Sequence, residues 1–186
     1  YKNQLLKDFQ SSDQSINSII NIATRFLIDN QIKNGKNETK WYLEKLYQCD
    51  SIGLYHLKNQ PIDYDILNQI VDFLVKRSNK IPFQYLIGYA SFYGRDYIVN
   101  KDTLIPRQES EILIHLIKNQ KECKMLDIGT GSGCLAITAI LEGIVDSVDA
   151  IDISDKALMV ARENANRLRA RHIDYIKLNI LNNMPD

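Results

Sequence analysis

The sequence predicts an α/β chain in which a small helical bundle and a β-hairpin linker precede part of a doubly wound parallel sheet. Apolar residues recur at helical spacing through the first 80 residues, and the period shortens to two after Pro82. Strand-like and helix-like runs alternate from Lys124 onward. We therefore expect a helical domain over 1–80, a hairpin linker over 81–106 and the first half of a sheet domain over 107–186.

The helical segment contains three amphipathic stretches. One covers residues 16–27, and a short aromatic-rich helix covers 41–47. Residues 30–40 are polar and contain Gly35, which indicates a loop. Asp63 can cap the third helix. The apolar stripe of that helix consists of Ile66, Leu67, Ile70, Val71 and Leu74. Because each stripe needs an apolar partner, the stretches predict a bundle.

The linker has the alternating pattern of a β-hairpin. Strands are expected over 91–93 and 96–99, with a turn at 94–95. Residues 103–107 follow as an extended loop, because a residue before proline avoids the helical region. A helix is then expected over 108–118. Its inward-facing residues are expected to be Ile112, Leu113, Leu116 and Ile117.

The last third of the chain has the pattern β-α-β-α-β. Strands are expected over 124–128, 147–151 and 172–178. A helix over 134–141 separates the first two strands, and a helix capped by Ser154 separates the last two. This order is typical of one half of a doubly wound parallel sheet.

The composition excludes several classes of protein. Hydrophobic residues make up 45% and charged residues 25%, as in ordinary globular domains. The 23 Lys+Arg balance the 23 Asp+Glu, which argues against an electrostatic grip on nucleic acid. No run is long enough for a membrane span, and no leader is seen. The three cysteines and three histidines are scattered and predict neither disulfides nor a metal site. We expect the cytoplasm or an organelle matrix as the compartment.

The stretch that is most informative about function is Asp127-Ile-Gly-Thr-Gly-Ser-Gly133, where a strand turns into a helix. Glycines allow a tight turn and let a ligand approach the backbone N–H groups. In an open α/β sheet such a turn lies at the carboxyl ends of the strands, where ligands bind. Asp152 closes the next strand, and its carboxylate can accept hydrogen bonds from both hydroxyls of a ribose. A dinucleotide and S-adenosylmethionine both fit such a site.

The spacing of the glycines distinguishes these two ligands. Dinucleotide loops read GxGxxG, whereas Gly131 is followed three residues later by Cys134, and the third glycine is Gly133. The Gly-Lys-Ser/Thr ending of a triphosphate loop is also missing from this motif. The acidic Asp127 suits a ligand with a cationic amino group. We therefore favour S-adenosylmethionine, with a purely structural turn as the alternative for the loop taken by itself.

Several motifs together carry a family resemblance. They are Pro82-Phe-Gln-Tyr-Leu-Ile-Gly88, Phe92-Tyr-Gly94, Thr103-Leu-Ile-Pro-Arg107 with Glu109 and Glu111, Leu126-Asp-Ile-Gly-Thr-Gly-Ser-Gly133, and Asp152. They resemble the HemK/PrmC-type protein-(glutamine-N5) methyltransferases. The resemblance implies a Rossmann-like S-adenosylmethionine-dependent methyltransferase domain, incomplete in this chain. It further implies methylation of the Gly-Gly-Gln glutamine in class I peptide chain release factors, with S-adenosylhomocysteine as the product.

The resemblance also implies roles for individual residues. Asp127 and the glycine loop would hold the methionine end of the cofactor, Asp152 the ribose, and Asn179 and Ile180 the adenine. The implied cofactor-binding residues are Asp127, Gly129, Thr130, Gly131, Ser132, Gly133, Asp152, Ile153, Asn179 and Ile180. The residues implied on the methyl and substrate side are Leu104, Pro106, Arg107 and Glu111. A simple ion pair between Arg107 and Glu111 is the alternative for those two.

The catalytic Asn-Pro-Pro-Tyr motif of the family does not occur in the chain, so no catalytic residue is assigned. We expect the parent protein to continue past Asp186, and this chain alone to bind the cofactor poorly and not to turn over. Residues 1–80 are expected to recognise the release factor. A monomer is expected, with no metal, no membrane contact and no direct contact with nucleic acid.

Two alternatives stay open. Within the same fold, the protein could methylate an amino group of adenine or of a small molecule. The basic residues Arg162, Arg167, Arg169 and Arg171 would suit nucleic acid, although a solvated helix face with its trailing loop explains them as well. In a different class, the chain could be a non-catalytic module that binds S-adenosylmethionine or a protein.

Overall fold

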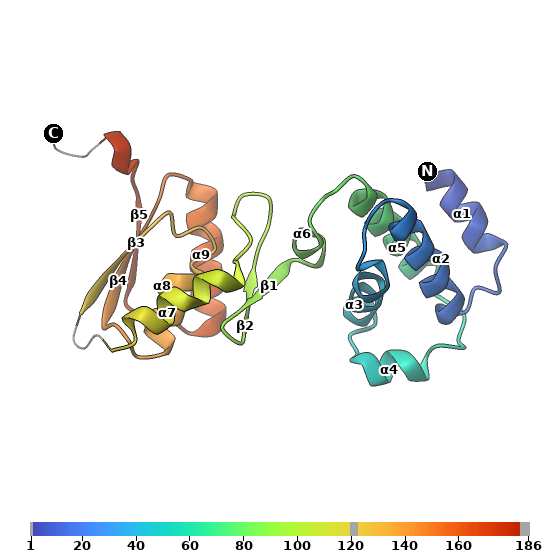
Figure 1. The fold of residues 1–186 in the computed structure, drawn as a ribbon, viewed down its shortest axis with the longest axis horizontal. Helices are drawn as coiled ribbons and strands as arrows, with labels where there is room; N and C mark the ends of the chain where they lie inside the picture. Colours follow the sequence, from blue (N-terminus) through green and yellow to red (C-terminus); the bar gives the residue numbers. More distant parts are fainter. Residues whose placement is uncertain (1, 120–122, 183–186) are drawn as a thin grey trace. The chain divides into compact units, whose positions relative to one another are not determined.

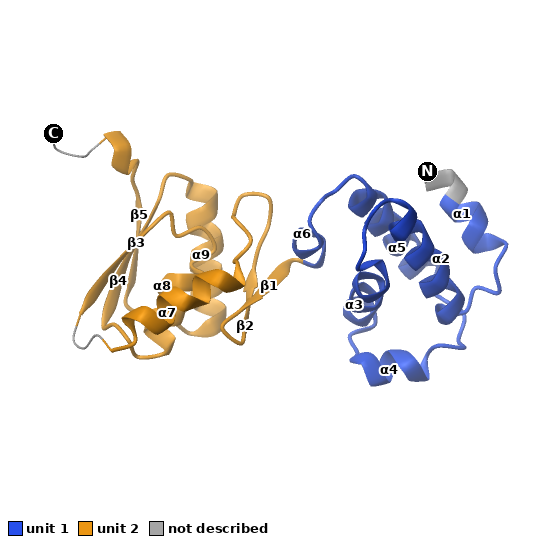
Figure 2. Cartoon of the chain, viewed as in Figure 1, with its two compact units in different colours: residues 1–87 blue, residues 88–186 orange. Residues whose placement is uncertain are grey.

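The computed structural model describes residues 2–119 and 123–182, in two compact units. Tyr1–Ile87 form a helical unit and Gly88–Asp186 an α/β unit, coloured blue and orange in Figure 2. The fold class predicted from the sequence is confirmed, because helices come first, a hairpin follows, and parallel strands alternate with helices at the end. Within the described ranges, no helix has the length and apolar character needed to cross a membrane.

The described part of the helical unit contains six helices (Figure 1). They are α1 (Lys2–Gln10), α2 (Ile16–Asp29), α3 (Gly35–Tyr47), α4 (Ser51–His56), α5 (Tyr64–Ser78) and α6 (Phe83–Ile87). The Asp63 carboxylate accepts a hydrogen bond from the Asp65 N–H at 2.8 Å, which confirms the predicted cap of α5. The predicted stripe of α2 is buried, and with Phe9, Leu43 and Phe73 it forms the centre of this unit.

The polar loop predicted over residues 30–40 is shorter than expected, because α3 already begins at Gly35. A Cβ atom on Gly35 would lie 2.7 Å from Cβ of Leu27 on α2. Gly35 is therefore required by a close approach of two helices, and its presence does not mark a loop. The Thr39 hydroxyl donates to the Gly35 carbonyl at 2.8 Å within this buried contact.

The predicted hairpin is present, but its turn is shifted by one residue. Strands β1 (Tyr89–Phe92) and β2 (Arg95–Ile98) pair antiparallel, so the turn is Tyr93-Gly94 and not 94–95. Both turn residues have positive φ, +50° and +70°, as the tight I′ turn of a hairpin requires. The Glu111 carboxylate accepts the Tyr93 N–H at 2.8 Å and holds this uncommon conformation.

The helix predicted over 108–118 begins as one 3₁₀ turn, η1 (Gln108–Ser110), and continues as α7 (Glu111–Ile117). The prediction of its inward face is wrong. Ile112, Leu113 and Leu116 are 60%, 46% and 69% exposed. Helix α7 packs against α8 through a narrow row in which Ile114 is fully buried and Ile117 is half-buried. Such a short helix buries one row of side chains, and the spacing alone does not say which row.

The sheet of the α/β unit has three parallel strands in the order β3-β4-β5. Its elements are β3 (Lys124–Ile128), α8 (Cys134–Leu141), β4 (Ser147–Asp152), α9 (Asp155–Leu168), β5 (Ile173–Lys177) and a final 3₁₀ turn η2 (Ile180–Asn182). Helices α8 and α9 contact each other on one side of the sheet (Figure 1). Because the strands are parallel and in register, the loops after β3 and β4 lie at the same end of the sheet.

Candidate functional site

The glycine loop between β3 and α8 has the backbone shape that the sequence predicts. Gly129, Gly131 and Gly133 have φ of +75°, +57° and +79°, in the left-handed region that favours glycine. A Cβ atom on Gly133 would lie 3.0 Å from Cδ1 of Ile137 and 3.1 Å from Cβ of Ala161. A Cβ on Gly129 would meet nothing within 4 Å, and one on Gly131 only a carbonyl oxygen at 3.8 Å. The loop is thus packed against helices at its end and open beside its first two glycines.

Asp152 fastens the glycine loop to the end of β4. One carboxylate oxygen accepts the Gly131 N–H at 2.9 Å, and the other accepts the Ser154 N–H at 2.9 Å. Each carboxylate oxygen has two acceptor positions, so both oxygens can still accept bonds from ligand hydroxyls. Asp152 therefore has a structural role at the loop in addition to the ligand-binding role expected from the sequence.

Asp127 lies beneath the loop and is 7% exposed. Its carboxylate accepts the Thr130 hydroxyl at 2.7 Å, and the Ile151 carbonyl accepts the N–H groups of Gly129 and Thr130 at 2.8 and 2.9 Å. Burial raises the pKa of Asp127, and the bond from Thr130 offsets part of that rise. A buried carboxylate of this kind gains from a nearby cationic group on a ligand.

Asn164 on α9 is a site residue that the sequence pattern does not single out. Its side chain is fully buried; the oxygen accepts the Ile98 N–H at 2.7 Å, and the nitrogen donates to the carbonyls of Ile98 and Ser132 at 3.0 and 2.9 Å. Asn164 thus joins the hairpin to the glycine loop. The signal in the sequence is a carboxamide between Ala161 and Ala165 on an otherwise apolar helix face.

Two titratable groups behind the loop are neutral at pH 7. Burial raises the pKa of the Cys134 thiol to about 11, and burial raises the pKa of Tyr97 to about 12. The Tyr97 hydroxyl lies 2.8 Å from the Thr138 hydroxyl, within hydrogen-bonding distance. Neither group is a nucleophile or base at neutral pH. In the part of the chain that the structure describes, no cluster of three or more His, Cys, Asp or Glu side chains could hold a metal ion.

The remaining residues expected to bind the cofactor lie at the same end of the sheet as Asp152. Ile153 follows β4 and is 62% exposed, and Asn179 follows β5. The Leu178 N–H donates to the Asp152 carbonyl at 3.1 Å, which joins the two strand ends. The Asn179 side-chain oxygen accepts the Leu181 N–H at 3.2 Å. Ile180 begins the 3₁₀ turn η2 and is half-buried.

The residues expected on the substrate side differ in exposure and in the groups that they contact. Leu104 is 70% exposed on the extended loop, and Arg107 on the same loop is also exposed. Pro106 is half-buried, whereas the Glu111 carboxylate is directed to the hairpin turn. Among the described residues no ion pair joins Arg107 to Glu111, so the simple local pair considered for them does not form.

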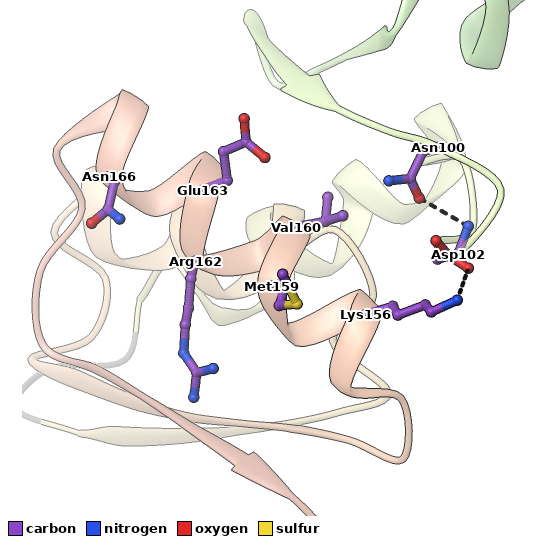
Figure 3. A pocket seen from close by; sticks show the side chains of 8 residues that line it. All are labelled: Asn100, Asp102, Lys156, Met159, Val160, Arg162, Glu163 and Asn166. Carbon is purple, nitrogen blue, oxygen red and sulfur yellow. Dashed lines mark hydrogen bonds and ion pairs between the residues drawn. The ribbon is translucent and has the colours of Figure 1, made fainter.

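A hollow of about 570 Å³ lies beside α9 and the loop that follows β2 (Figure 3). Two cations of this hollow have partners within the unit. The Lys156 ammonium group lies 4.0 Å from the Asp102 carboxylate, and the Arg162 guanidinium donates to the Tyr175 carbonyl at 3.2 Å. Arg162 also lies over the Tyr175 ring, 5.2 Å from its centroid.

Two of the four arginines considered for nucleic acid take part in contacts within the unit. Arg162 bonds to Tyr175, and Arg167 donates to the Asp96 carbonyl. Arg169 has positive φ at the end of α9, where it caps the helix. These contacts favour the interpretation of a solvated helix face with its trailing loop.

Two family descriptions match the chain. The sequence model of the PrmC N-terminal domain matches residues 18–88, and that of ribosomal protein L11 methyltransferase (PrmA) matches residues 111–185. Curated proteins named "Release factor glutamine methyltransferase" match most of the chain. The chain is similar in sequence to release factor glutamine methyltransferases. The resemblance predicted from the sequence is confirmed.

Three release factor glutamine methyltransferases illustrate the similarity. That of Bacillus subtilis (strain 168) is 40% identical over 119 residues, which are 60% of this chain and 41% of the relative. That of Flavobacterium psychrophilum is 39% identical over 146 residues, 75% of this chain and 51% of the relative. That of Fusobacterium nucleatum is 31% identical over 179 residues, 94% of this chain and 50% of the relative. The chain spans about half the length of the curated relatives it matches.

Proposed function

We propose that the protein containing this chain transfers a methyl group from S-adenosylmethionine to the side-chain nitrogen of the Gly-Gly-Gln glutamine in class I peptide chain release factors. The names of the relatives support the reaction and the substrate. The observation that carries the proposal is the glycine loop, which is open beside Gly129 and Gly131 and fastened to Asp152. S-adenosylhomocysteine is then the product that leaves the site.

The residues at the loop fit the proposed cofactor. The space beside Gly129 and Gly131 lets a ligand approach the backbone, and the remaining acceptor positions of Asp152 suit the two ribose hydroxyls. The buried carboxylate of Asp127 suits the cationic amino group of the methionine end. When bound, S-adenosylmethionine supplies an electrophilic methyl group on a sulfonium.

At the neighbouring strand end, the exposed Ile153 offers an apolar surface for the nucleoside. Ile180 is proposed to lie against the adenine, and the side-chain oxygen of Asn179 is proposed to accept a hydrogen bond from the adenine amino group. This acceptor is neutral, so its hydrogen bond is weaker than one to a carboxylate would be.

The site must also position the side chain of the substrate glutamine. Its amide nitrogen is a poor nucleophile because the lone pair is delocalised, so alignment with the methyl group is the main contribution that a protein can make. We assign the exposed loop containing Leu104, Pro106 and Arg107 to this side of the reaction, with Glu111 fixing the hairpin turn beside it. The family's Asn-Pro-Pro-Tyr motif does not occur in these 186 residues, so no catalytic residue is assigned.

The same proposal assigns a separate role to each of three segments of the chain. Residues 1–80 recognise the release factor, residues 81–106 link the two parts, and residues 107–186 hold the cofactor. The protein acts as a monomer in the cytoplasm, on a protein substrate and without direct contact with nucleic acid. The match of residues 18–88 to the PrmC N-terminal domain supports the first of these assignments.

Calorimetric titration of the whole protein tests the cofactor. We expect heat for S-adenosylmethionine and S-adenosylhomocysteine and none for a nicotinamide dinucleotide. Asp152→Asn removes a charge-assisted acceptor and is expected to weaken cofactor binding about 10- to 100-fold, because a bond to a charged group contributes about 1.5–3 kcal/mol. The matched control is Asp174→Asn, which removes an exposed carboxylate of β5 and leaves affinity unchanged.

Transfer of a labelled methyl group from S-adenosylmethionine to a purified release factor tests the reaction in the whole protein. Replacing the glutamine of the Gly-Gly-Gln motif should abolish the label. Heat for the dinucleotide alone would refute the cofactor assignment, and label on the glutamine-free substrate would refute the target.

A further inference from the structure

The helical unit has a hollow of about 490 Å³ between α2, α3 and α4. Its walls carry three lysines, Lys36, Lys40 and Lys58, and one carboxylate, Glu44. In the described part of the chain, none of these four groups lies in an ion pair. The Lys58 ammonium group lies 3.8 Å from the ring centroid of Tyr55, which is 62% exposed. The hollow therefore has an excess of positive charge that the helical unit does not neutralise.

Two other hollows among the described residues differ in this respect. In one, Arg77 binds the carboxylate of Glu38 with an N–O distance of 2.6 Å. In the hollow of Figure 3, Lys156 lies 4.0 Å from Asp102. Cations that are already paired gain less from a ligand, so the hollow between α2, α3 and α4 is the best placed of the three to attract an anion.

The positions of two of the lysines are unfavourable for the helix itself. Lys36 lies in the first turn of α3, where the helix dipole disfavours a cation. Lys40 follows at i+4, and like charges at this spacing repel each other. Glu44, one further turn on, does not come within ion-pair distance of Lys40. The stability of α3 therefore gives no reason for this arrangement, whereas an anionic partner does.

The uncharged groups of the hollow suit a polypeptide. Buried Ile20 and Leu54 form an apolar base, and Asn17 and Asn21 lie one turn apart on the exposed side of α2. A carboxamide both donates and accepts hydrogen bonds, as a peptide backbone does. The exposed ring of Tyr55 is of the type enriched in protein interfaces.

We propose that this hollow is the docking site for an acidic segment of a protein partner. Carboxylates of the segment pair with Lys36 and Lys40, while its backbone meets the carboxamides of α2. A protein is favoured over a nucleic acid, because arginine, the residue best suited to phosphate, is missing from the lining. The partner is the release factor if the proposed function is right; only this identity rests on that proposal.

The test measures binding of the 186-residue chain to two probes by fluorescence anisotropy at low salt. The probes are a labelled peptide of alternating glutamate and leucine and a purified class I release factor. The double variant Lys36→Gln/Lys40→Gln should weaken both interactions about 2- to 30-fold, because two exposed ion pairs of about 0.2–1 kcal/mol each are lost. The matched control Lys7→Gln/Lys76→Gln removes two exposed lysines of α1 and α5 and should change affinity less than twofold.

The outcomes separate the two proposals. If the acidic peptide binds at these lysines and the release factor does not, the docking site stands and the proposed substrate fails. If the release factor binds and both double variants bind it equally well, the docking site is refuted and the proposed substrate stands. Failure of both probes to bind refutes the site. Tighter binding of a single-stranded RNA of matched charge, lost in Lys36→Gln/Lys40→Gln, refutes the choice of a protein partner.

Discussion

The two units differ in what they bury. Among the described residues of the helical unit, the buried side chains are almost all apolar, and Phe9, Leu27 and Phe73 have exposed fractions of 1% or less. The α/β unit also buries polar side chains, and most of them surround the glycine loop. They are Thr103, Asp127, Thr130, Ser132, Thr138 and Asn164. Apolar burial stabilises without fixing direction, whereas buried polar groups hold a backbone in one shape when all their bonds are made. The difference indicates that packing supports the helical unit, while hydrogen bonds give the α/β unit its loop.

The largest effect is expected for a substitution in the apolar core of the helical unit. Phe73 stacks on Tyr42 with ring centroids 4.3 Å apart, and Phe73→Ala should destabilise the helical unit by about 4 kcal/mol, as cavities left by buried aromatic residues do. Trp41 is the single tryptophan and lies in this unit, so its fluorescence in a urea titration reports the change. Tyr64→Ala, at a 67% exposed position of α5, should shift the free energy by less than about 0.5 kcal/mol. Equal effects of the two substitutions would show that Phe73 is not part of a packed core.

An intermediate effect is expected in the polar network. Asn164→Leu leaves the Ser132 carbonyl and both backbone groups of Ile98 without their partner, and should destabilise the α/β unit by about 3 kcal/mol. Hydrogen exchange should accelerate in β2 and the glycine loop, while the Trp41 urea curve stays unchanged. Asn166→Leu, at an exposed position of the same helix, serves as the control. Unchanged exchange at β2 in Asn164→Leu would contradict the role of Asn164 in joining the hairpin to the glycine loop.

The smallest expected effect concerns Asp127. Burial raises its pKa, so the folded unit holds the proton more tightly than the unfolded chain does. The stability from this group is complete below the unfolded pKa of about 3.9 and is lost as pH rises through the folded pKa. Asp127→Asn keeps an oxygen that accepts the Thr130 hydroxyl, and its side chain does not ionise. The stability of the variant should therefore increase relative to that of the parent chain as the pH rises from 4 to 7. Thermal unfolding at several pH values measures the difference. A gain that shrinks toward pH 7 would show that folding lowers the pKa of Asp127 and does not raise it.

The same contrast explains which parts of the fold could be predicted from the sequence. The bounds of β3 and α8 agree with the prediction to the residue, because a short run with apolar residues, a glycine loop and an apolar helix follow one another without ambiguity. The stripes of α2 and α5 were equally clear, since both helices are long enough to show their period. Periodicity and turn residues therefore predict the elements that supply the candidate site.

The features that the sequence did not predict are fixed by contacts between residues that are not neighbours in the sequence. The hairpin turn is displaced because Tyr93 adopts a positive φ held by Glu111, which lies in another element. Gly35 is a residue type that predicts a loop, but here it packs against Leu27 of the neighbouring helix. Asn164 has no local motif, and its importance depends on Ile98 and Ser132, which are far away in the sequence. Local patterns carry no information on such partners.

The exposed loop that contains Leu104 is restrained at both ends. Before it, the N–H and hydroxyl groups of Thr103 donate to the Asn100 carbonyl at 3.1 and 3.2 Å; after it, Glu111 is bonded to Tyr93. A short segment tethered in this way has few conformations to lose when another molecule touches it. Contact with Leu104 would therefore carry a small entropic penalty, and most of the binding enthalpy gained there would remain as affinity.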